Sequence, residues 1–287
     1  MLHGAVLLFG VAGLFAKWIA LPALLIVWGR VLFATAALAL LLLAQGRPLG
    51  VRTRGQRLRL GACGLLLVAH WWAFFHAIQV STVAVGLLAY ATAPVLVVWL
   101  EPWWFAERFS RGALAAALAS LAGVALMVPR WDWADATARG VAWGVVAGLT
   151  FAVLSLLNRE LVQSEDGVRL ALAQDAVAAA LLTPLALALG IVPTLRELAL
   201  LALLGVVCTA LAHSWYIQSM RGLPARVAAI VSNLEPLYGI VLALLLLGEV
   251  PQPRVLLGGA LILAGAGWVT WRARRAAAPD TPGSSAV

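Results

Sequence analysis

Ionisable side chains inside long apolar runs are the residues of this sequence most able to do chemistry. Glu235 lies in an apolar run from about Val227 to Leu247. A charge at the centre of a bilayer costs at least about 2.5–3.5 kcal/mol on insertion scales, so such a residue usually faces a partner, a cavity or a pathway. Its carboxyl group could take up a proton, bind a cationic group, or both. The alternative is a neutral Glu that fixes helix packing through hydrogen bonds.

A proline follows this carboxylate directly. Pro236 removes one backbone donor, which predicts a local opening of the helix and a free carbonyl on Ser232. Ser232 and Tyr238 lie three residues to either side of Glu235 and are predicted to share its face, so a polar wall that includes Asn233 is expected. Pro94 precedes a similar apolar segment. Both prolines are candidate hinges, although transmembrane prolines commonly only kink a helix.

Histidine and aromatic residues are concentrated in one further run, from His70 to His76. Trp72 and His76 are four residues apart and share a helix face, whereas His70 points toward Phe74. An aromatic wall could stack on a planar or cationic substrate, and His can titrate in the physiological range. The alternative is ordinary helix packing, with His76 near the outer interface. The candidate substrate-binding residues are His70, Trp72, His76, Tyr90, Thr92, His213, Trp215, Tyr216, Ser232, Asn233, Glu235 and Tyr238.

Three other charges are expected inside the membrane. Lys17 and Arg30 are basic residues inside predicted spans; Lys17 is near enough to an interface to snorkel, and Arg30 is deep enough to need an acidic or carbonyl partner. Asp175 is the remaining intramembrane acid, and a structural ion pair is one interpretation of it. Asn158 is expected to cap the cytoplasmic end of its helix.

The composition sets the class of protein that can contain these residues. Hydrophobic residues make up 63% of the chain, charged residues 11%, and the mean hydropathy is +0.98, which excludes a soluble domain of this length. The formal charge of +8 comes from arginines in short loops, a topology signal and not a nucleic-acid surface. Cys63 and Cys208 lie in apolar runs, so no disulfide, metal site or cofactor is expected.

The apolar runs predict an all-α membrane protein of ten transmembrane helices. At about 20 residues per crossing, the spans are 3–21, 23–44, 60–79, 82–101, 112–129, 138–157, 169–190, 196–218, 226–247 and 254–272. Fourteen arginines fall on the side of the two termini and four on the other, which predicts cytoplasmic termini. Residues 273–287 are expected to form a disordered cytoplasmic tail.

The ten spans are expected to form two copies of one unit. An offset of 142 residues places Pro94 on Pro236, Glu107 on Glu249, and the triplet from Leu121 on that from Leu263. Five helices per copy is an odd number, so the second copy must enter the membrane from the opposite face. The sequence therefore predicts inverted repeats over 1–130 and 138–272, with a site between them at the midplane.

These features resemble the EamA family of the drug/metabolite transporter superfamily. The resemblance is carried by Pro94, by the Glu107-Arg108-Phe109-Ser110 motif, by Leu234-Glu235-Pro236, by Leu246-Leu247-Gly248-Glu249, by Phe9-Gly10 and by Gly29 to Ala34. It covers residues 4–272 and implies ten helices in two inverted repeats, with export of amino acids, nucleosides, drugs or other metabolites. Family members often have a Lys where this chain has His76.

The expected function is secondary transport of a small organic metabolite, most often amino acids or amino-acid-like compounds, across a bacterial inner membrane by alternating access. Export is the direction that the resemblance implies. An uptake permease and a lipid or drug flippase on the same fold are the alternatives. An enzyme is not expected, because Glu235 and Asp175 stand on different helices without a supporting motif, and His70 and His76 are six residues apart. The partners expected are a small substrate and the bilayer, without nucleic acid, and the short loops are compatible with a monomer.

Overall fold

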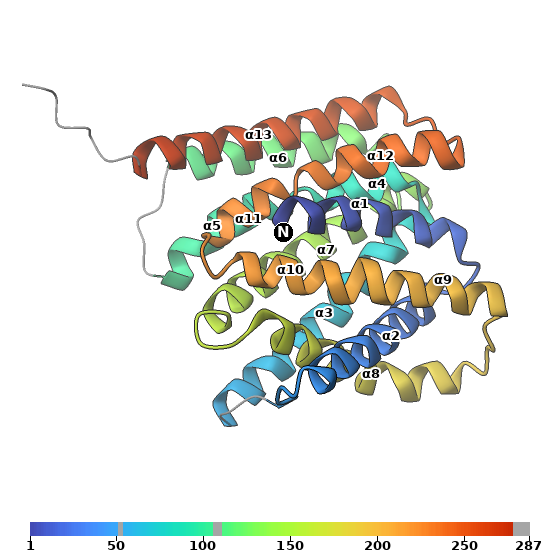
Figure 1. Cartoon of the computed structure of the whole chain (residues 1–287). Coiled ribbons are helices and arrows are strands. Elements are labelled where there is room, and N and C mark those ends of the chain that lie inside the picture. The colour runs from blue at the N-terminus through green and yellow to red at the C-terminus, as the bar shows by residue number, and fades with distance from the viewer. Residues whose placement is uncertain (51–53, 106–110, 278–287) are drawn as a thin grey trace, which may run out of the picture.

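The computed structural model describes residues 1–50, 54–105 and 111–277, and every regular element in these ranges is a helix (Figure 1). The all-helical class is therefore confirmed for the described part of the chain. The helices are α1 Leu2–Trp18, α2 Ala23–Ala44, α3 Arg54–Val80, α4 Val83–Tyr90, α5 Ala93–Phe105, α6 Arg111–Met127, α7 Ala136–Leu161, α8 Gly167–Ala188, α9 Leu195–Gly205, the π-helical η1 Val206–Leu211, α10 Ala212–Ser219, α11 Ala225–Val231, α12 Leu234–Leu247 and α13 Pro253–Ala277.

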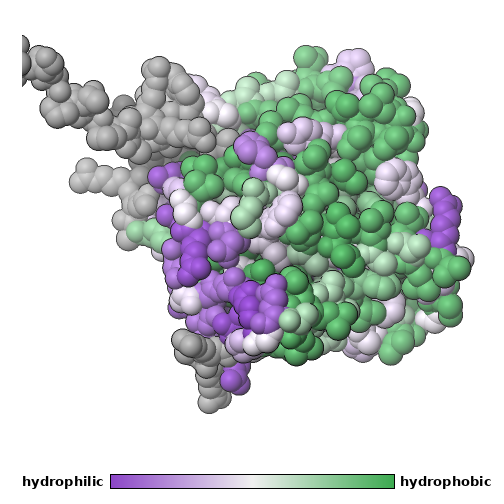
Figure 2. Space-filling view, viewed as in Figure 1, coloured by the Kyte–Doolittle hydropathy of each residue, from purple (hydrophilic) through white to green (hydrophobic). Residues whose placement is uncertain are grey.

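The helical segments follow the predicted spans closely. Within the described residues, seven segments are long and apolar enough to cross a membrane, and three shorter apolar helices accompany them at Leu2–Trp18, Leu114–Met127 and Pro253–Trp268. The count of ten spans stays a prediction. Figure 2 shows a broad apolar surface, with most hydrophilic residues gathered at one end of the molecule and a few at the opposite end. An apolar belt between polar ends is the distribution expected in a bilayer. The tail expected from residue 273 begins as helix, because α13 continues to Ala277, and residues 278–287 lie outside the described residues.

Helix ends are set by short polar side chains and glycine. The side chain of Thr82 accepts a hydrogen bond from the backbone N–H of Val85 and caps α4, and Asp135 and Asp166 cap α7 and α8 in the same way. Such caps satisfy backbone donors that have no partner inside the helix. At the other end of α12, Gly248 adopts φ 66°, a left-handed conformation that glycine accepts without strain.

Two of the predicted spans are interrupted just before their prolines. The fourth span breaks between Tyr90 and Ala93, and the ninth between Val231 and Leu234. Pro94 and Pro236 therefore stand in the first turn of a new helix, where a missing N–H costs least. The prediction of a free carbonyl on Ser232 was wrong. This carbonyl accepts a hydrogen bond of 2.9 Å from the N–H of Glu235, because the chain forms a tight turn at the interruption.

The two halves of the chain interlock through reciprocal helix contacts. α1 of the first half packs against α12 of the second, and α7 of the second packs against α4 of the first, while α2 packs on α8 and α6 on α13. Glycine allows two of these crossings. A Cβ on Gly10 would lie 2.9 Å from the Cβ of Tyr238, and one on Gly144 would lie 2.5 Å from the Cβ of Ala89. Close approach at small residues is the usual way in which helices pack in a membrane.

The α4–α7 crossing supplies a prediction about folding. Gly144→Ala inserts a methyl group into occupied space, and overpacking of this kind costs about 1–3 kcal/mol. We expect a lower yield of folded protein and a lower midpoint of thermal unfolding in detergent. Gly267→Ala is the matched control, because Gly267 is also helical but a Cβ there meets nothing within 4 Å. Equal behaviour of the two variants would contradict the role of Gly144 in the crossing.

Ion pairs gather at the end of the bundle that carries the connections α2–α3, α7–α8 and α10–α11 (Figure 1). The most buried of these acids is Glu101 of α5, which is 2% exposed. Its carboxylate accepts from Arg159 of α7 at 2.5 Å and from Arg226 of α11 at 3.3 Å. These bonds join the first half of the chain to the second half at this end.

A different contact joins the halves at the opposite end. The carboxylate of Glu249, in the second half, accepts hydrogen bonds of 3.1 Å from the backbone N–H groups of Val83 and Ala84 at the start of α4. Lys17 donates to the carbonyl of Ser81 beside it, at 2.9 Å. A carboxylate at a helix N-terminus is favoured both by hydrogen bonding and by the helix dipole.

Glu249→Gln is therefore expected to destabilise the fold by about 1 kcal/mol, because one amide oxygen replaces two charged acceptors. The measurement is the apparent midpoint of thermal unfolding in detergent. Asp132→Asn, in the connection between α6 and α7, is the control and is expected to leave the midpoint unchanged. A Gln variant as stable as the parent would show that this cap contributes nothing.

Candidate functional site

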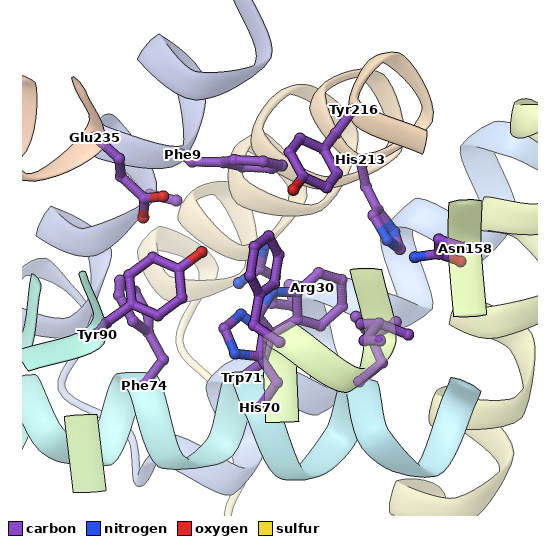
Figure 3. A pocket seen from close by; sticks show the side chains of 14 residues that line it. Phe9, Arg30, His70, Trp71, Phe74, Tyr90, Asn158, His213, Tyr216 and Glu235 are labelled. Atoms are coloured by element: carbon purple, nitrogen blue, oxygen red, sulfur yellow. The ribbon is translucent and has the colours of Figure 1, made fainter. Parts of the chain in front are cut away.

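A cavity lies at the centre of the bundle, between the two halves (Figure 3). The volume open to the centres of water molecules is about 30 Å³, enough for one or two waters. Its wall is mainly aromatic and includes one carboxylate and one guanidinium group. The lining residues are Phe9, Ala12, Arg30, Leu67, His70, Trp71, Phe74, Tyr90, Phe151, Leu154, Asn158, His213, Tyr216 and Glu235.

The lining draws on matching positions of the two halves. Phe9 and Phe151 are 142 residues apart, as are Ala12 and Leu154, and His70 and His213 are separated by one residue more. This is the offset that aligns the two prolines. The charged residues do not follow it, because Ala93 corresponds to Glu235 and Leu172 to Arg30. The aromatic wall is thus shared between the halves, whereas each charge is present in one half only.

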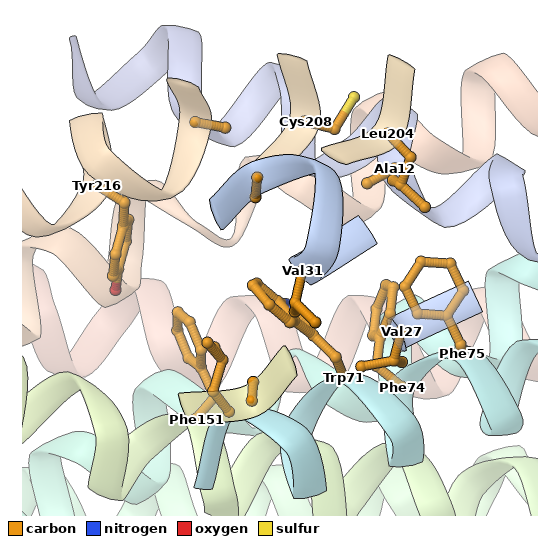
Figure 4. Packing of buried hydrophobic residues seen from close by; sticks show 14 of the residues in the cluster. Ala12, Val27, Val31, Trp71, Phe74, Phe75, Phe151, Leu204, Cys208 and Tyr216 are labelled. Atoms are coloured by element: carbon orange, nitrogen blue, oxygen red, sulfur yellow. The ribbon is translucent and has the colours of Figure 1, made fainter. Parts of the chain in front are cut away.

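Arg30 lies on α2 and is only 1% exposed. Its guanidinium lies over the ring of Trp71, 3.8 Å from the centroid, and its Nε donates to the hydroxyl of Thr209 at 3.0 Å. Thr209 belongs to the π-helical segment η1, where its hydroxyl also donates to the carbonyl of Leu204. In the described part of the chain, stacking on an aromatic face and one hydroxyl hold the guanidinium. The acids Asp175 and Glu235 lie within electrostatic range of it, and a direct acidic or carbonyl partner stays a prediction. Figure 4 shows the apolar packing around Trp71.

Glu235 reaches the cavity from the first turn of α12 and is 4% exposed. Its carboxylate makes no hydrogen bond or ion pair with the described part of the chain. Arg30 is within electrostatic range of it, and Tyr90 also lines this side of the cavity (Figure 3). An unpaired buried carboxylate is costly, so this group is suited to a cation or a proton that enters the cavity.

The aromatic wall is fixed by ring contacts and by one hydrogen bond. The ring of His70 lies 5.1 Å from that of Phe151 and 5.5 Å from that of Tyr90. Its Nδ1 lies 2.9 Å from the carbonyl oxygen of Ala147, so Nδ1 carries the proton and donates it. Tyr216 closes the opposite part of the wall, 5.8 Å from Phe9 between ring centroids. These rings offer flat apolar faces to a bound molecule.

A polar cluster lies at the far side of the cavity from Glu235 (Figure 3). Nδ1 of His213 lies 3.8 Å from an oxygen of Asp175 on α8. Asp175 is fully buried, and neither of its carboxylate oxygens has a hydrogen-bond partner among the described residues. Asn158 accepts a bond of 2.6 Å from Gln174. Asn158 was predicted to cap its helix, but α7 continues to Leu161, which places its side chain in the cavity wall.

The structure brings five of the twelve predicted binding residues to the cavity: His70, Tyr90, His213, Tyr216 and Glu235. Trp72 and His76 stack on each other at 5.1 Å, away from the cavity, and contact Trp143. Trp215 lies against Gly4. The hydroxyl of Thr92 donates to the carbonyl of Ala89, and Asn233 is half-buried outside the lining. The binding roles of these residues stay predictions.

The predicted polar wall along one helix face does not form. Ser232 donates to the carbonyl of Ala228, and Tyr238 packs against Gly10, so only Glu235 of the three lines the cavity. The reason is the interruption after Val231, which breaks the helical phase between Ser232 and Glu235. Of the predicted intramembrane charges, Arg30 lines the cavity, Asp175 lies behind it beside His213, and Lys17 lies at the end of the bundle.

Several lining residues were not predicted. Trp71, Phe74, Phe9 and Phe151 form much of the aromatic wall. The repeat offset gives a signal for all four, because Phe9 aligns with Phe151, Trp71 with His213 and Phe74 with Tyr216. Trp71 and Phe74 fall in the predicted aromatic run but were not among the predicted binding residues.

Comparison with known proteins identifies the family. The sequence profile described as the EamA-like transporter family matches residues 1–128 and again 138–271. The chain belongs to the EamA-like transporter family. The predicted resemblance is thereby confirmed, and this transporter is a multi-pass membrane protein. The family motif from Glu107 to Ser110 lies outside the described residues.

Relatives with curated names agree with this assignment. The chain is 25% identical over 267 residues to the uncharacterized transporter YxxF of Bacillus subtilis, covering 91% of this chain and 85% of that protein. It is 29% identical to the uncharacterized transporter YwfM of Bacillus subtilis, with 67% and 66% covered. An uncharacterized transporter of Archaeoglobus fulgidus is 31% identical, with 69% and 71% covered.

A solved structure titled "Crystal structure of protein" matches with a TM-score of 0.70 and 21% identity over 96% of both chains. This likeness shows the fold alone.

Proposed function

We propose that this transporter moves amino acids or closely similar zwitterions across the bacterial inner membrane by alternating access. The observation that carries the proposal is the pair of opposite charges in one aromatic cavity, Glu235 on one helix and Arg30 on another. A carboxylate complements an ammonium group, and a guanidinium complements a carboxylate in a planar, bidentate geometry. A zwitterionic amino acid carries both an ammonium group for Glu235 and a carboxylate for Arg30.

The contacts between the halves support alternating access. Glu101 bonds to Arg159 and Arg226 at one end of the bundle, and Glu249 caps α4 at the other. Movement of one half against the other would open one set of contacts while the other set holds. The interruptions before Pro94 and Pro236 lie beside the cavity and are suited to act as hinges. Two inverted five-helix repeats and cytoplasmic termini are part of this proposal.

Export is the direction we propose, with uptake as the alternative on the same fold. A lipid flippase is less favoured, because the charged groups that line the cavity are almost fully buried between the two halves.

The proposed function is tested by counterflow in proteoliposomes. Purified protein is reconstituted with an unlabelled amino acid inside, and entry of the labelled amino acid is followed without any ion gradient. We expect exchange of zwitterionic amino acids, faster for aromatic than for small side chains because of the ring-lined wall. Lipid analogues are expected to give no exchange. Absence of exchange for every amino acid, with exchange of a simple organic cation or a lipid, would overturn the proposed substrate class.

A further inference from the structure

His213 and Asp175 form a buried ionisable pair apart from Glu235 and Arg30. His213 lines the cavity from α10, and Asp175 lies behind it on α8. Neither carboxylate oxygen of Asp175, nor Nδ1 of His213, has a hydrogen-bond partner in the described part of the chain. At 3.8 Å the contact is too long for a hydrogen bond but short enough for a strong charge interaction once the imidazole is protonated. The ring of Trp71 packs edge-on against the imidazole at 5.5 Å.

Two charged or titratable groups from other elements are within electrostatic range of this pair, and two more are within electrostatic range of Arg30. Arg30 of α2 is within electrostatic range of Asp175. His70 of α3 interacts in the same way with His213. Cys208 of η1 and Glu235 of α12 both lie within electrostatic range of Arg30. Asp175 thus has two candidate counter-charges: the permanent one on Arg30, and the one that His213 gains when it binds a proton.

We propose that the His213–Asp175 pair is a proton-binding site, and that its protonation controls how strongly Arg30 binds the carboxylate of the substrate. A hydronium ion in the cavity water gives a proton to the imidazole: one O–H bond breaks, one N–H bond forms, and a neutral water molecule is left. The imidazolium then compensates Asp175, which leaves the charge of Arg30 to the substrate. When the imidazole loses its proton, Arg30 is the remaining counter-charge of Asp175. Substrate binding is then weaker, because the guanidinium compensates Asp175 as well as the substrate carboxylate. This rests on the proposed function, because it assigns the carboxylate of the substrate to Arg30.

The test is the affinity for an amino acid as a function of pH, measured with purified protein. Coupling between two sites is typically about 5- to 150-fold, so affinity is expected to rise by such a factor between about pH 8 and about pH 5, where His titrates. His213→Gln is expected to give a weak affinity at every pH. His213→Lys, which keeps a positive charge over this range, is expected to give high affinity without pH dependence. Asp175→Asn is expected to remove the pH dependence as well.

Two controls isolate the pair. His3→Gln changes an exposed histidine at the start of α1 and is expected to keep the parent pH profile. An amine analogue without a carboxylate is expected to bind independently of pH, because the effect acts through Arg30. A pH profile that survives in both the Gln and the Lys variants at position 213 would overturn the proposal, and so would a parent affinity that does not change with pH.

A second measurement separates this proposal from the proposed function. In the absence of any substrate, potentiometric titration of the parent between about pH 8 and about pH 5 is expected to show uptake of about one proton more than the His213→Gln variant. If no amino acid binds at all, the proposed substrate is wrong, and the titration still decides whether the pair binds a proton. Equal uptake by parent and variant would overturn the proton site even where transport is confirmed.

Discussion

Glu235→Gln is expected to remove most transport of zwitterionic amino acids while the protein still folds. Gln keeps the shape of the side chain but loses the charge that would bind the ammonium group. Loss of one partner of a buried charge pair costs about 2–5 kcal/mol, which is roughly 30- to 4,000-fold in affinity. The measurement is binding and counterflow exchange of a labelled amino acid by parent and variant at equal reconstitution.

The control for this prediction is a substrate without the ammonium group. An N-acylated or deaminated analogue has no cation for Glu235 to bind, so its weak binding is expected to be equal in parent and variant. A variant that exchanges amino acids as the parent does would show that Glu235 is a packing residue. If the variant keeps downhill exchange but loses accumulation driven by a pH gradient, Glu235 is the proton site and not the ammonium site. In that case the protonation of the His213–Asp175 pair is expected to have no effect on transport.

The helices could be predicted from the sequence because they are apolar runs, seven of membrane length and three shorter among the described residues, separated by polar connections. Thr82, Asp135 and Asp166 all stand where a cap is expected, at the change from polar to apolar sequence. The sequence predicted a local opening of the helix at Pro236 and candidate hinges at both prolines, but not the interruptions at 91–92 and 232–233. Proline predicts that a helix is disturbed nearby, but it does not by itself predict the residue at which the chain breaks.

The site was predicted less completely, because the lining of a cavity depends on contacts across helices. Spacing along one helix shows which residues share a face, but not which face meets the cavity. Trp72 and Trp71 are neighbours in the sequence; Trp71 stacks on Arg30 inside the molecule, whereas Trp72 stacks on His76. Residues whose burial needs a compensating partner, such as Glu235, His213 and Arg30, were the ones that sequence reasoning identified.

Arg30→Gln is expected to be as damaging as Glu235→Gln, but for the other end of the substrate. The guanidinium is held over Trp71 and by Thr209, so its position is fixed before a substrate arrives and little conformational freedom is lost on binding. Its removal leaves the substrate carboxylate without a partner in an aromatic cavity, again at about 2–5 kcal/mol. Arg30→Lys is expected to recover only part of this, because an ammonium group cannot stack or bind bidentately as a guanidinium does.

The decisive comparison combines this variant with substrates that lack one charge. An amine analogue without the carboxylate is expected to bind equally to Arg30→Gln and to the parent, but weakly to Glu235→Gln. An analogue without the ammonium group is expected to bind equally to Glu235→Gln and to the parent, but weakly to Arg30→Gln. In such a cycle, each variant and the matching substrate change remove the same interaction, so their effects do not add. If both variants instead weakened every analogue by the same factor, the two charges would be holding the cavity together and the zwitterion assignment would fail.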